Sequence, residues 1–322
     1  MSCPNLILGS LLAMAAPAVA QNCDCYLIDG QYPTYFRNYG FWDFRSMSQY
    51  ASSSPPPIPD TLEGQGQAPF TNEYLDYASN QFTKFWSPMN WTAGSDEFPM
   101  PNSYNNLYFE NDEAGETDTF LTMRTARKPG FQTVAEFESN DYYDHASMRM
   151  RARTRGSPGA CTAMFTYREY DYDVREDAQE TDIEILTNDP TNKIRYTNQP
   201  SWLYNDDGEI ESVPGASNEV IIDEPWDEWA DHRLDWTPGR TTWYLNGDET
   251  FSMTFQVPTD PSRIVFNAWS NGDPEWSGLM PVGGAAYQHI QWIELAYNVV
   301  DAGSCSNVCN VDGGVPGSPQ KI

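Results

Sequence analysis

The sequence predicts an all-β protein, a double-sheet sandwich of jelly-roll type. Short runs rich in Val, Ile, Thr, Tyr, Phe or Trp, each bounded by Gly, Pro, Asn or Asp, recur along the chain. Helical periodicity is nearly absent, and no low-complexity linker or internal repeat divides the middle of the chain. Many antiparallel strands in one chain favour two curved sheets, and the concave sheet of such a sandwich forms a long open groove.

The predicted strands follow one another from Asn106 to Tyr297. In chain order they are 106–109, 119–124, 146–153, 161–168, 181–186, 232–236, 241–245, 250–255, 264–269 and 289–297, with a further strand at 193–200. Asn246-Gly247 lies between two of these runs and predicts a tight hairpin. The four prolines between Ser52 and Pro59 predict a loop.

Three carboxylates occupy alternate positions in the run at 181–186. Glu180, Asp182 and Glu184 therefore lie on one face of a strand, while Ile183 and Ile185 face the other way, into the core between the sheets. Neighbouring carboxylates repel and raise one another's pKa. Glycoside hydrolysis needs this arrangement, because one carboxyl must be ionised while another is protonated. The alternative is a solvated acidic face in a chain rich in Asp and Glu.

The charge of the chain excludes several partners. The net charge is −28, from 46 acidic and 18 basic residues. Such a surface repels phosphate backbones and anionic lipid, so we expect no nucleic-acid and no membrane partner. Aromatic residues make up 14% of the chain, which argues against disorder. They can fill a β core, and they can also form platforms for sugar rings.

The first twenty residues predict a secretory signal peptide. An apolar run at 6–16 is followed by Ala18-Val19-Ala20, a small-x-small cleavage site, although no Lys or Arg precedes the run. Asn90-Trp91-Thr92 is a glycosylation sequon, which makes Asn90 a candidate acceptor. We therefore expect a secreted, extracellular glycoprotein.

Four of the five cysteines of the mature chain cluster at its two ends. Cys23 and Cys25 lie near one end and Cys305 and Cys309 near the other. In an oxidising compartment, at least one disulfide should join the first pair to the second, although the spacing does not give the connectivity. A zinc site is the alternative, but Cys-x-Cys and Cys-x₃-Cys without a nearby His fit zinc poorly. Cys161 lies in an apolar run and is expected to be a buried, inert thiol.

Nearly the whole mature chain resembles one enzyme family. Glu180-Thr181-Asp182-Ile183-Glu184 is similar to the Glu-x-Asp-x-Glu signature of glycoside hydrolase family 16, the retaining β-glucanases and related transglycosylases. Three further segments resemble this family in the same order: 232–238 (HRLDWTP), 243–247 (WYLNG) and 264–269 (IVFNAW) followed by 276–278 (WSG). The Cys-Asp-Cys start and the Cys-bounded end resemble a secreted fungal branch.

The resemblance implies a fold, domain limits and roles. The fold would be a concanavalin A-like β-jelly-roll sandwich of two curved antiparallel sheets, with a catalytic domain at 21–309 after a signal peptide at 1–20. Residues 310–322 are expected to be a disordered tail. Glu180 would be the nucleophile and Glu184 the general acid and base, while Asp182 would separate their proton affinities.

The binding residues are expected on the same groove. Trp269 and Trp276 are candidate sugar platforms, while Trp243 and His232 are candidates for which a structural role in the core is an equal alternative. The strand at 193–200 departs from the licheninase pattern, since alternation gives Arg195, Thr197 and Gln199 to the groove. This departure leaves the glucan linkage open.

The predicted function is a secreted retaining endo-glycosidase that hydrolyses β-1,3 or mixed β-1,3/1,4-glucan. The alternatives are a cell-wall transglycosylase of the same family and a non-catalytic glucan-binding protein. A binding protein would not need three aligned carboxylates. We expect a monomer with a polysaccharide substrate and no required cofactor; no metal ligands are predicted, and structural calcium is left open.

Overall fold

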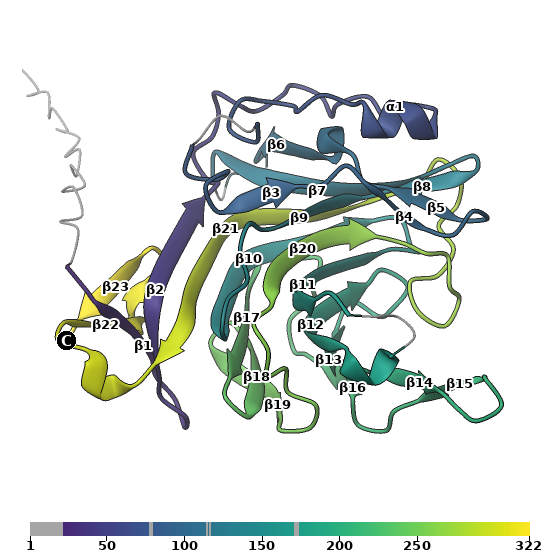
Figure 1. Ribbon diagram of the computed structural model, residues 1–322. Coiled ribbons are helices and arrows are strands. Elements are labelled where there is room, and N and C mark those ends of the chain that lie inside the picture. Colours follow the sequence, from purple (N-terminus) through teal and green to yellow (C-terminus); the bar gives the residue numbers. More distant parts are fainter. Residues whose placement is uncertain (1–21, 77–79, 114, 116, 171–173) are drawn as a thin grey trace, which may run out of the picture.

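Two curled β-sheets pack face to face in the computed structural model, which describes residues 22–322 except 77–79, 114, 116 and 171–173 (Figure 1). One sheet has twelve strands and is called the large sheet; the other has seven strands. The architecture is the predicted all-β jelly roll. The predicted signal peptide lies outside the described residues.

The large sheet is a path of nine strands with three more attached to β21 through β7. The path runs β19 (Asp248–Met253), β18 (Arg240–Leu245), β17 (Ala230–Thr237), β10 (Ala146–Gly156), β21 (Ala285–Val300), β2 (Thr34–Asp43), β1 (Cys25–Ile28), β22 (Val308–Val315) and β23 (Ser318–Lys321), and the attached strands are β6 (Leu107–Asn111), β7 (Thr119–Lys128) and β8 (Phe131–Thr133).

The seven-stranded sheet carries the three aligned carboxylates near its middle. Its order is β16 (Ser217–Ile221), β13 (Lys193–Asn198), β12 (Gln179–Leu186), β11 (Cys161–Arg168), β20 (Arg263–Trp269), β9 (Ala135–Ser139) and β3 (Trp86–Pro88). Every neighbouring pair in this sheet is antiparallel.

Small elements complete the described chain. Two short hairpins are formed by β4 (Thr92–Gly94) with β5 (Pro99–Pro101) and by β14 (Trp202–Tyr204) with β15 (Ile210–Ser212); the helices are α1 (Leu62–Gly66) and the 3-10 turns Tyr104–Asn106, Arg175–Asp177 and Ala302–Ser304. Thr61 caps α1, since its Oγ1 accepts the Gly64 N–H at 3.1 Å. None of the helices in the described ranges has the length and apolarity to cross a bilayer.

The strands predicted from 106 to 297 are all present, with boundaries shifted by a few residues. The predicted hairpin at Asn246-Gly247 joins β18 to β19, and both turn residues have positive φ, 50° and 91°. This conformation explains the Asn-Gly pair, because both residue types tolerate the left-handed region. The prolines at 52–59 lie in a loop, as predicted.

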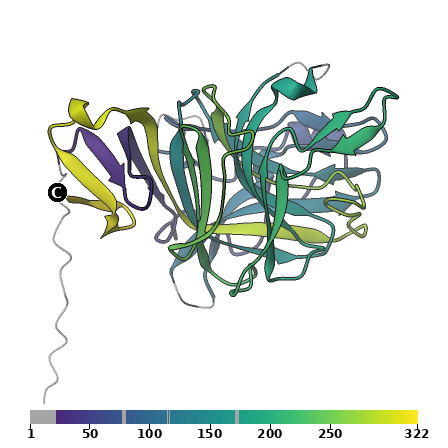
Figure 2. The ribbon, with the colours of Figure 1, turned by 90° about the horizontal axis from the view of Figure 1, so that it is seen from below.

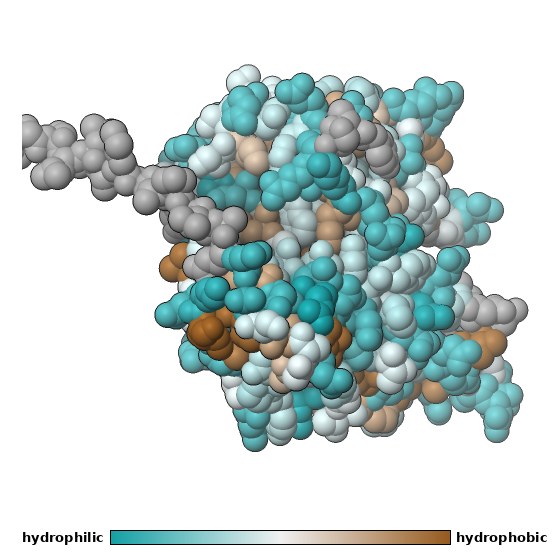
Figure 3. Space-filling view, turned by 60° about the vertical axis from the view of Figure 1, so that its left-hand side comes forward, coloured by the Kyte–Doolittle hydropathy of each residue, from teal (hydrophilic) through white to brown (hydrophobic). Residues whose placement is uncertain are grey.

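The core lies between the two sheets. Met148 and Leu234 on the large sheet and Ile183 and Phe266 on the seven-stranded sheet are fully buried in one cluster. Ile183 and Ile185 thus face inward, as predicted, and the carboxylates that alternate with them face the other side of the sheet. The outer surface in Figure 3 is mostly hydrophilic, in keeping with the net charge of −28.

Two disulfides join the ends of the described chain. Cys23 pairs with Cys309 and Cys25 with Cys305, so the prediction of a bond between the two terminal pairs is confirmed. The same ends are joined by hydrogen bonds, because β1 and β22 pair in parallel. Figure 2 shows the purple N-terminal and yellow C-terminal strands side by side at one end of the molecule.

The prediction of a disordered tail at 310–322 is wrong. These residues form most of β22 and all of β23, which extend the large sheet. Asp312 anchors them, since its carboxylate lies 2.7 Å from Arg233 Nη1 and 2.9 Å from Arg149 Nη2. The tail has a polar, Gly- and Pro-rich sequence, and its order comes from pairing with β1 and from these distant arginines.

Removing both disulfides should destabilise the protein far more than removing either one. Each bond closes a loop of about the same span, 286 or 280 residues. Closing one such loop contributes on the order of 4–5 kcal/mol in the chain-entropy model, and the second bond then closes only a small ring. We expect denaturant unfolding to show a small loss in Cys23→Ala/Cys309→Ala or Cys25→Ala/Cys305→Ala, and a large loss in the four-fold variant. Equal losses at both steps would contradict this account.

Candidate active site

The carboxylate-bearing strand, β12, lies between β11 and β13. Its register places Glu184 opposite Ala163 on β11 and Arg195 on β13, and places Asp182 opposite Phe165 on β11. Directly opposed residues in antiparallel strands share a face. The residue opposite Glu184 on β11 is thus small, which leaves space above the strand.

All three carboxylates line one cavity, of about 80 Å³. The residues around it are Ala163, Phe165, Glu180, Asp182, Glu184, Asn267 and Trp269. Strand alternation alone predicted the shared face, and the structure confirms that the three acids meet in a single hollow. The other walls come from β11 and β20.

Glu184 is more enclosed than Glu180. Its side chain is buried, and its Oε1 accepts hydrogen bonds from Trp276 Nε1 at 3.3 Å and from Cys161 Sγ at 3.3 Å. Burial raises the pKa of Glu184, while these two donors and the positive charge of Arg195 act in the opposite direction. A raised pKa keeps this carboxyl protonated at higher pH than an exposed Glu, as a general acid requires.

Asp182 lies between the two glutamates and is 1% exposed. Burial raises its pKa well above the usual range, and the charges of Glu180 and Glu184 add to the rise. A hydrogen bond with Glu180 acts in the same direction, whereas one with Gln199 lowers the pKa. Asp182 in its protonated form can therefore donate to Glu180 and help to keep that carboxylate ionised.

Trp243 supports β12 from behind and does not line the groove. It is 0% exposed in the core, and its indole Nε1 donates to the backbone oxygen of Asp182 at 2.9 Å. The Tyr196 ring stacks on it with centroids 5.2 Å apart. The prediction of a sugar contact for Trp243 is wrong, because β18 belongs to the large sheet and this side chain points inward.

His232 is also a core residue. It is 1% exposed and lies on β17 between Ala230 and Leu234, both members of the inter-sheet core, so all three share its inward face. Burial lowers the pKa of His232 to about 4. Because the imidazole is buried between the two sheets, it cannot contact a sugar beside the carboxylates. The prediction of a sugar contact for His232 is therefore wrong as well.

The three groove residues predicted on β13 have different surroundings. Arg195 is bound by Asp189, with Nε 2.9 Å from Oδ2, and its guanidinium lies 4.7 Å from the ring centroid of Trp276. Thr197 is opposite Asp182 but is buried, and its hydroxyl bonds to Ser217 at 3.0 Å. Gln199 follows the strand, and its side chain acts to lower the pKa of Asp182. Contact of these three side chains with sugar stays a prediction.

Trp269 and Trp276 are the two partly exposed tryptophans beside the carboxylates. Trp269 ends β20 and lines the cavity, and Trp276 lies on the loop that follows. That loop is fixed by its own hydrogen bonds, including Trp276 N–H to the Asp273 oxygen at 3.1 Å and Ser277 Oγ to Asn271 Oδ1 at 2.7 Å. The loop thereby presents the Trp276 indole N–H to Glu184.

Sequence reasoning missed a fourth acid on this face. Glu136 on β9 is opposite Asn267, and its Oε2 accepts from Asn267 Nδ2 at 3.4 Å. Burial raises the pKa of Glu136 to about 7. The signal was present in the sequence, since Glu136 and Glu138 alternate with buried Ala135 and Phe137 in a short strand.

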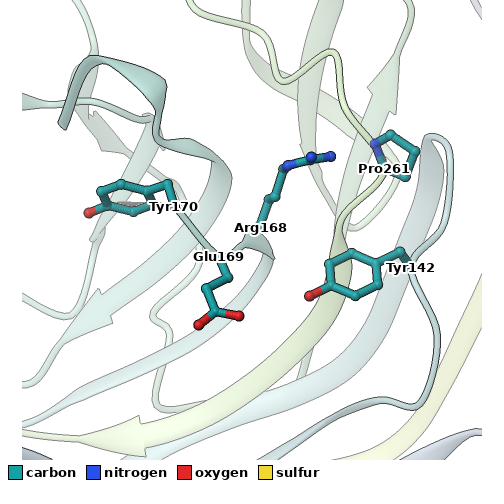
Figure 4. Close-up of a pocket in the computed structure, with 5 residues that line it drawn as sticks. All are labelled: Tyr142, Arg168, Glu169, Tyr170 and Pro261. Atoms are coloured by element: carbon teal, nitrogen blue, oxygen red, sulfur yellow. The ribbon is translucent and has the colours of Figure 1, made fainter. Parts of the chain in front are cut away.

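A larger hollow, of about 550 Å³, lies beyond the Glu180 end of the carboxylate row. It is lined by Tyr142, Arg168, Glu169, Tyr170 and Pro261 (Figure 4). Arg168 ends β11 three residues after Phe165, which is about 10 Å along a strand. Among the described residues that line this hollow, Glu169 is the one carboxylate, whereas the smaller cavity brings three carboxylates together, so we assign the candidate chemistry to the smaller cavity.

Two other sequence predictions concern the surface and metals. Asn90 is exposed, as a glycosylation acceptor must be, and its modification stays a prediction. In the part of the chain that the structure describes, no group of three or more His, Cys, Asp or Glu side chains is arranged to hold a metal ion.

A jelly roll that gathers three carboxylates and the side chain of Trp269 in one cavity is typical of a glycoside hydrolase. The comparison with family models agrees. The chain belongs to glycosyl hydrolases family 16, whose model matches residues 88–293, more than half of the chain.

Bacterial β-glucanases are among its relatives. The chain is 27% identical to a β-glucanase of Bacillus subtilis (strain 168) over 72% of this chain and 88% of that protein, and 25% identical to one of Paenibacillus macerans over 60% and 75%. The solved Bacillus licheniformis β-glucanase superposes with a TM-score of 0.52 at 20% identity, covering 68% of this chain and 94% of that one. This likeness confirms the fold. The fungal branch stays a prediction.

Trp269→Ala should weaken glucan binding more than it disturbs folding. A partly exposed ring that stacks on a sugar contributes to affinity, so we expect a loss on the order of ten-fold in binding of a glucan oligosaccharide. Loss of a buried Trp instead costs roughly 3–5 kcal/mol of stability. The control is Trp243→Ala, which should lower the melting temperature strongly, since Trp243 is 0% exposed. An equally large fall for Trp269→Ala would assign it to the core.

Proposed function

We propose that this protein is a retaining endo-glucanase that cleaves β-1,3 or mixed β-1,3/1,4-glucan. The observation that carries the proposal is the cavity in which Glu180, Asp182 and Glu184 meet. Two carboxyl groups with separate proton affinities are what a double displacement at an anomeric carbon requires. The relatives named β-glucanase support glucan as the substrate class.

In the first step, Glu180 attacks the anomeric carbon and forms a glycosyl ester as the glycosidic bond breaks. Glu184 gives its proton to the leaving oxygen, which departs as the hydroxyl of the released chain. The raised pKa of Glu184 keeps that proton available. Asp182 donates to Glu180 and so stabilises the carboxylate before attack.

In the second step, Glu184 acts as a base. Now ionised, it takes a proton from water, the hydroxyl attacks the anomeric carbon, and Glu180 is released as a carboxylate. Two inversions give net retention. Arg195, which favours the charged form of Glu184, assists this half of the cycle.

The substrate is held across the strands by the groups beside the carboxylates. Trp269 offers an aromatic face, and Asn267 and Glu136 offer hydrogen-bonding groups for sugar hydroxyls. The two terminal disulfides and the strongly acidic surface support an extracellular location.

The test is incubation with barley mixed-linkage glucan, laminarin and chitin oligomers, with separation of the products and proton NMR of the first anomer released. We expect short glucan oligosaccharides from one or both glucans, β-anomers first and no products from chitin. Products longer than the substrate would indicate transglycosylation. An α-anomer as the first product, or no cleavage of any glucan, would overturn the proposal.

A further inference from the structure

The single free thiol in the described chain lies directly beside the proposed acid. Cys161 begins β11, is 0% exposed, and is opposite Leu186, two pairs along from the Ala163–Glu184 pair and therefore on the same face of the sheet. Diagonal neighbours on one face of a sheet lie within reach of each other's side chains. Because Ala163 is small, the Cys161 Sγ reaches Glu184 Oε1 at 3.3 Å.

A second donor reaches the same oxygen from the other side of the site. Trp276 Nε1 lies 3.3 Å from Oε1 of Glu184. A carboxyl oxygen has two lone pairs, and both are engaged when two donors converge on it. The proton of the neutral acid therefore has to reside on Oε2, the oxygen that neither donor contacts.

We propose that Cys161 is a positioning residue for the acid: together with Trp276 it occupies Oε1 of Glu184, so that Oε2 carries the transferable proton. This inference rests on the proposed role of Glu184. A thiol suits the position, because Cys161 is also packed against Trp269 and Leu186 in a small apolar cluster. It acts there as a compact apolar side chain that still provides one weak donor.

The other charged and titratable groups around Glu184 do not replace this contact. Asp182 and Glu180 are acids on the same strand, and in their charged forms they oppose ionisation of neighbouring carboxyls. Arg195, opposite Glu184 on β13, favours the charged form of Glu184 through its positive charge. Besides the Trp276 indole, Cys161 is thus the group that hydrogen-bonds the carboxyl directly.

The experiment compares Cys161→Val, which fills the site without a donor, with Cys161→Ser, which keeps a donor. Glutamate labelled with ¹³C at the side-chain carboxyl reports the titration of Glu184 by NMR, and the Glu184→Gln protein assigns its resonance. Loss of a hydrogen bond to a charged group should raise the pKa of Glu184 by about one pH unit in the Val variant. In the Ser variant the pKa should stay at or below that of the unaltered protein.

Kinetics give an independent readout. The alkaline limb of kcat/KM should move to higher pH in Cys161→Val and not in Cys161→Ser, since this limb reports the acid in the free enzyme. The Val variant should lose more activity on glucan than on a dinitrophenyl glycoside, whose leaving group needs no proton. Thr162→Val is the matched control. The Thr162 side chain lies on the face of β11 opposite Cys161, and its replacement removes a buried 2.6 Å hydrogen bond with Thr154. It should leave the titration of Glu184 and the pH profile of kcat/KM unchanged.

An unchanged or lowered Glu184 pKa in Cys161→Val, or equal titrations in the Val and Ser variants, would overturn the inference. If Cys161→Val does not fold, Cys161→Ala serves in its place. The NMR titration does not depend on turnover, so the inference can fail while glucan hydrolysis is observed, and the proposed function can fail while the titration shifts as expected.

Discussion

The Glu180→Gln protein should fold normally and lose glucan hydrolysis almost completely, with a fall in kcat on the order of 10⁴-fold or more. The amide matches the carboxylate in size but cannot form the glycosyl ester. Glu180 is only half-buried, so the exchange should change the melting temperature little. Reducing-sugar release from mixed-linkage glucan and thermal unfolding measure the two effects.

The matched control for this variant is Glu169→Gln. Glu169 follows β11 and lines the larger hollow, outside the carboxylate cavity. It should keep nearly full hydrolysis. A Glu180→Gln protein that remains as active as Glu169→Gln on every glucan would remove Glu180 from the mechanism.

The Glu184→Ala protein should also lose most of its activity on glucan, on the order of 10²–10⁴-fold, because no group then protonates the leaving oxygen. An activated aryl glycoside leaves without that proton, so the glycosyl ester should still form and then accumulate. Added azide should restore turnover by attacking the ester, and the product should be a β-glycosyl azide. The release of the phenol and the configuration of the azide measure this result.

Sodium chloride at the same ionic strength is the control for azide. Azide should give no such rescue in Glu180→Gln, in which no ester forms. Rescue by chloride as well, or an α-azide from Glu184→Ala, would contradict a double displacement in which Glu184 is the acid and base.

Asp182→Asn should be impaired less than either glutamate variant, because Asp182 forms no bond to the sugar.

The sequence predicted those strands that are rich in β-branched and aromatic residues and are bounded by turn residues. The strands predicted between 106 and 297 have this composition, and the structure contains them. β22 and β23 could not be predicted in the same way. Their residues are polar and include Gly and Pro, and they are ordered by the parallel pairing with β1 and by Asp312 with Arg233.

For the site, the alternation of residues predicted the correct face of β12, but two of the predicted neighbours were wrong. Alternation brings Glu180, Asp182 and Glu184 together whichever sheet β12 joins. His232 and Trp243 could be assigned to the core only once it was known that β17 and β18 lie in the opposite sheet, whose inward face meets the core. The contact of Cys161 with Glu184 depends on the register of β11 against β12, which no local pattern specifies.

The bonds between Cys23 and Cys309 and between Cys25 and Cys305 make the covalent chain a closed ring. A protease that cuts once in any loop between Cys25 and Cys305 therefore releases nothing, and the nicked molecule keeps its full mass on a gel without reductant. Only a second cut frees a fragment, and the strands of that fragment are still paired with those of the remainder. At the proposed extracellular location, this ring would allow a nicked molecule to persist as a single unit.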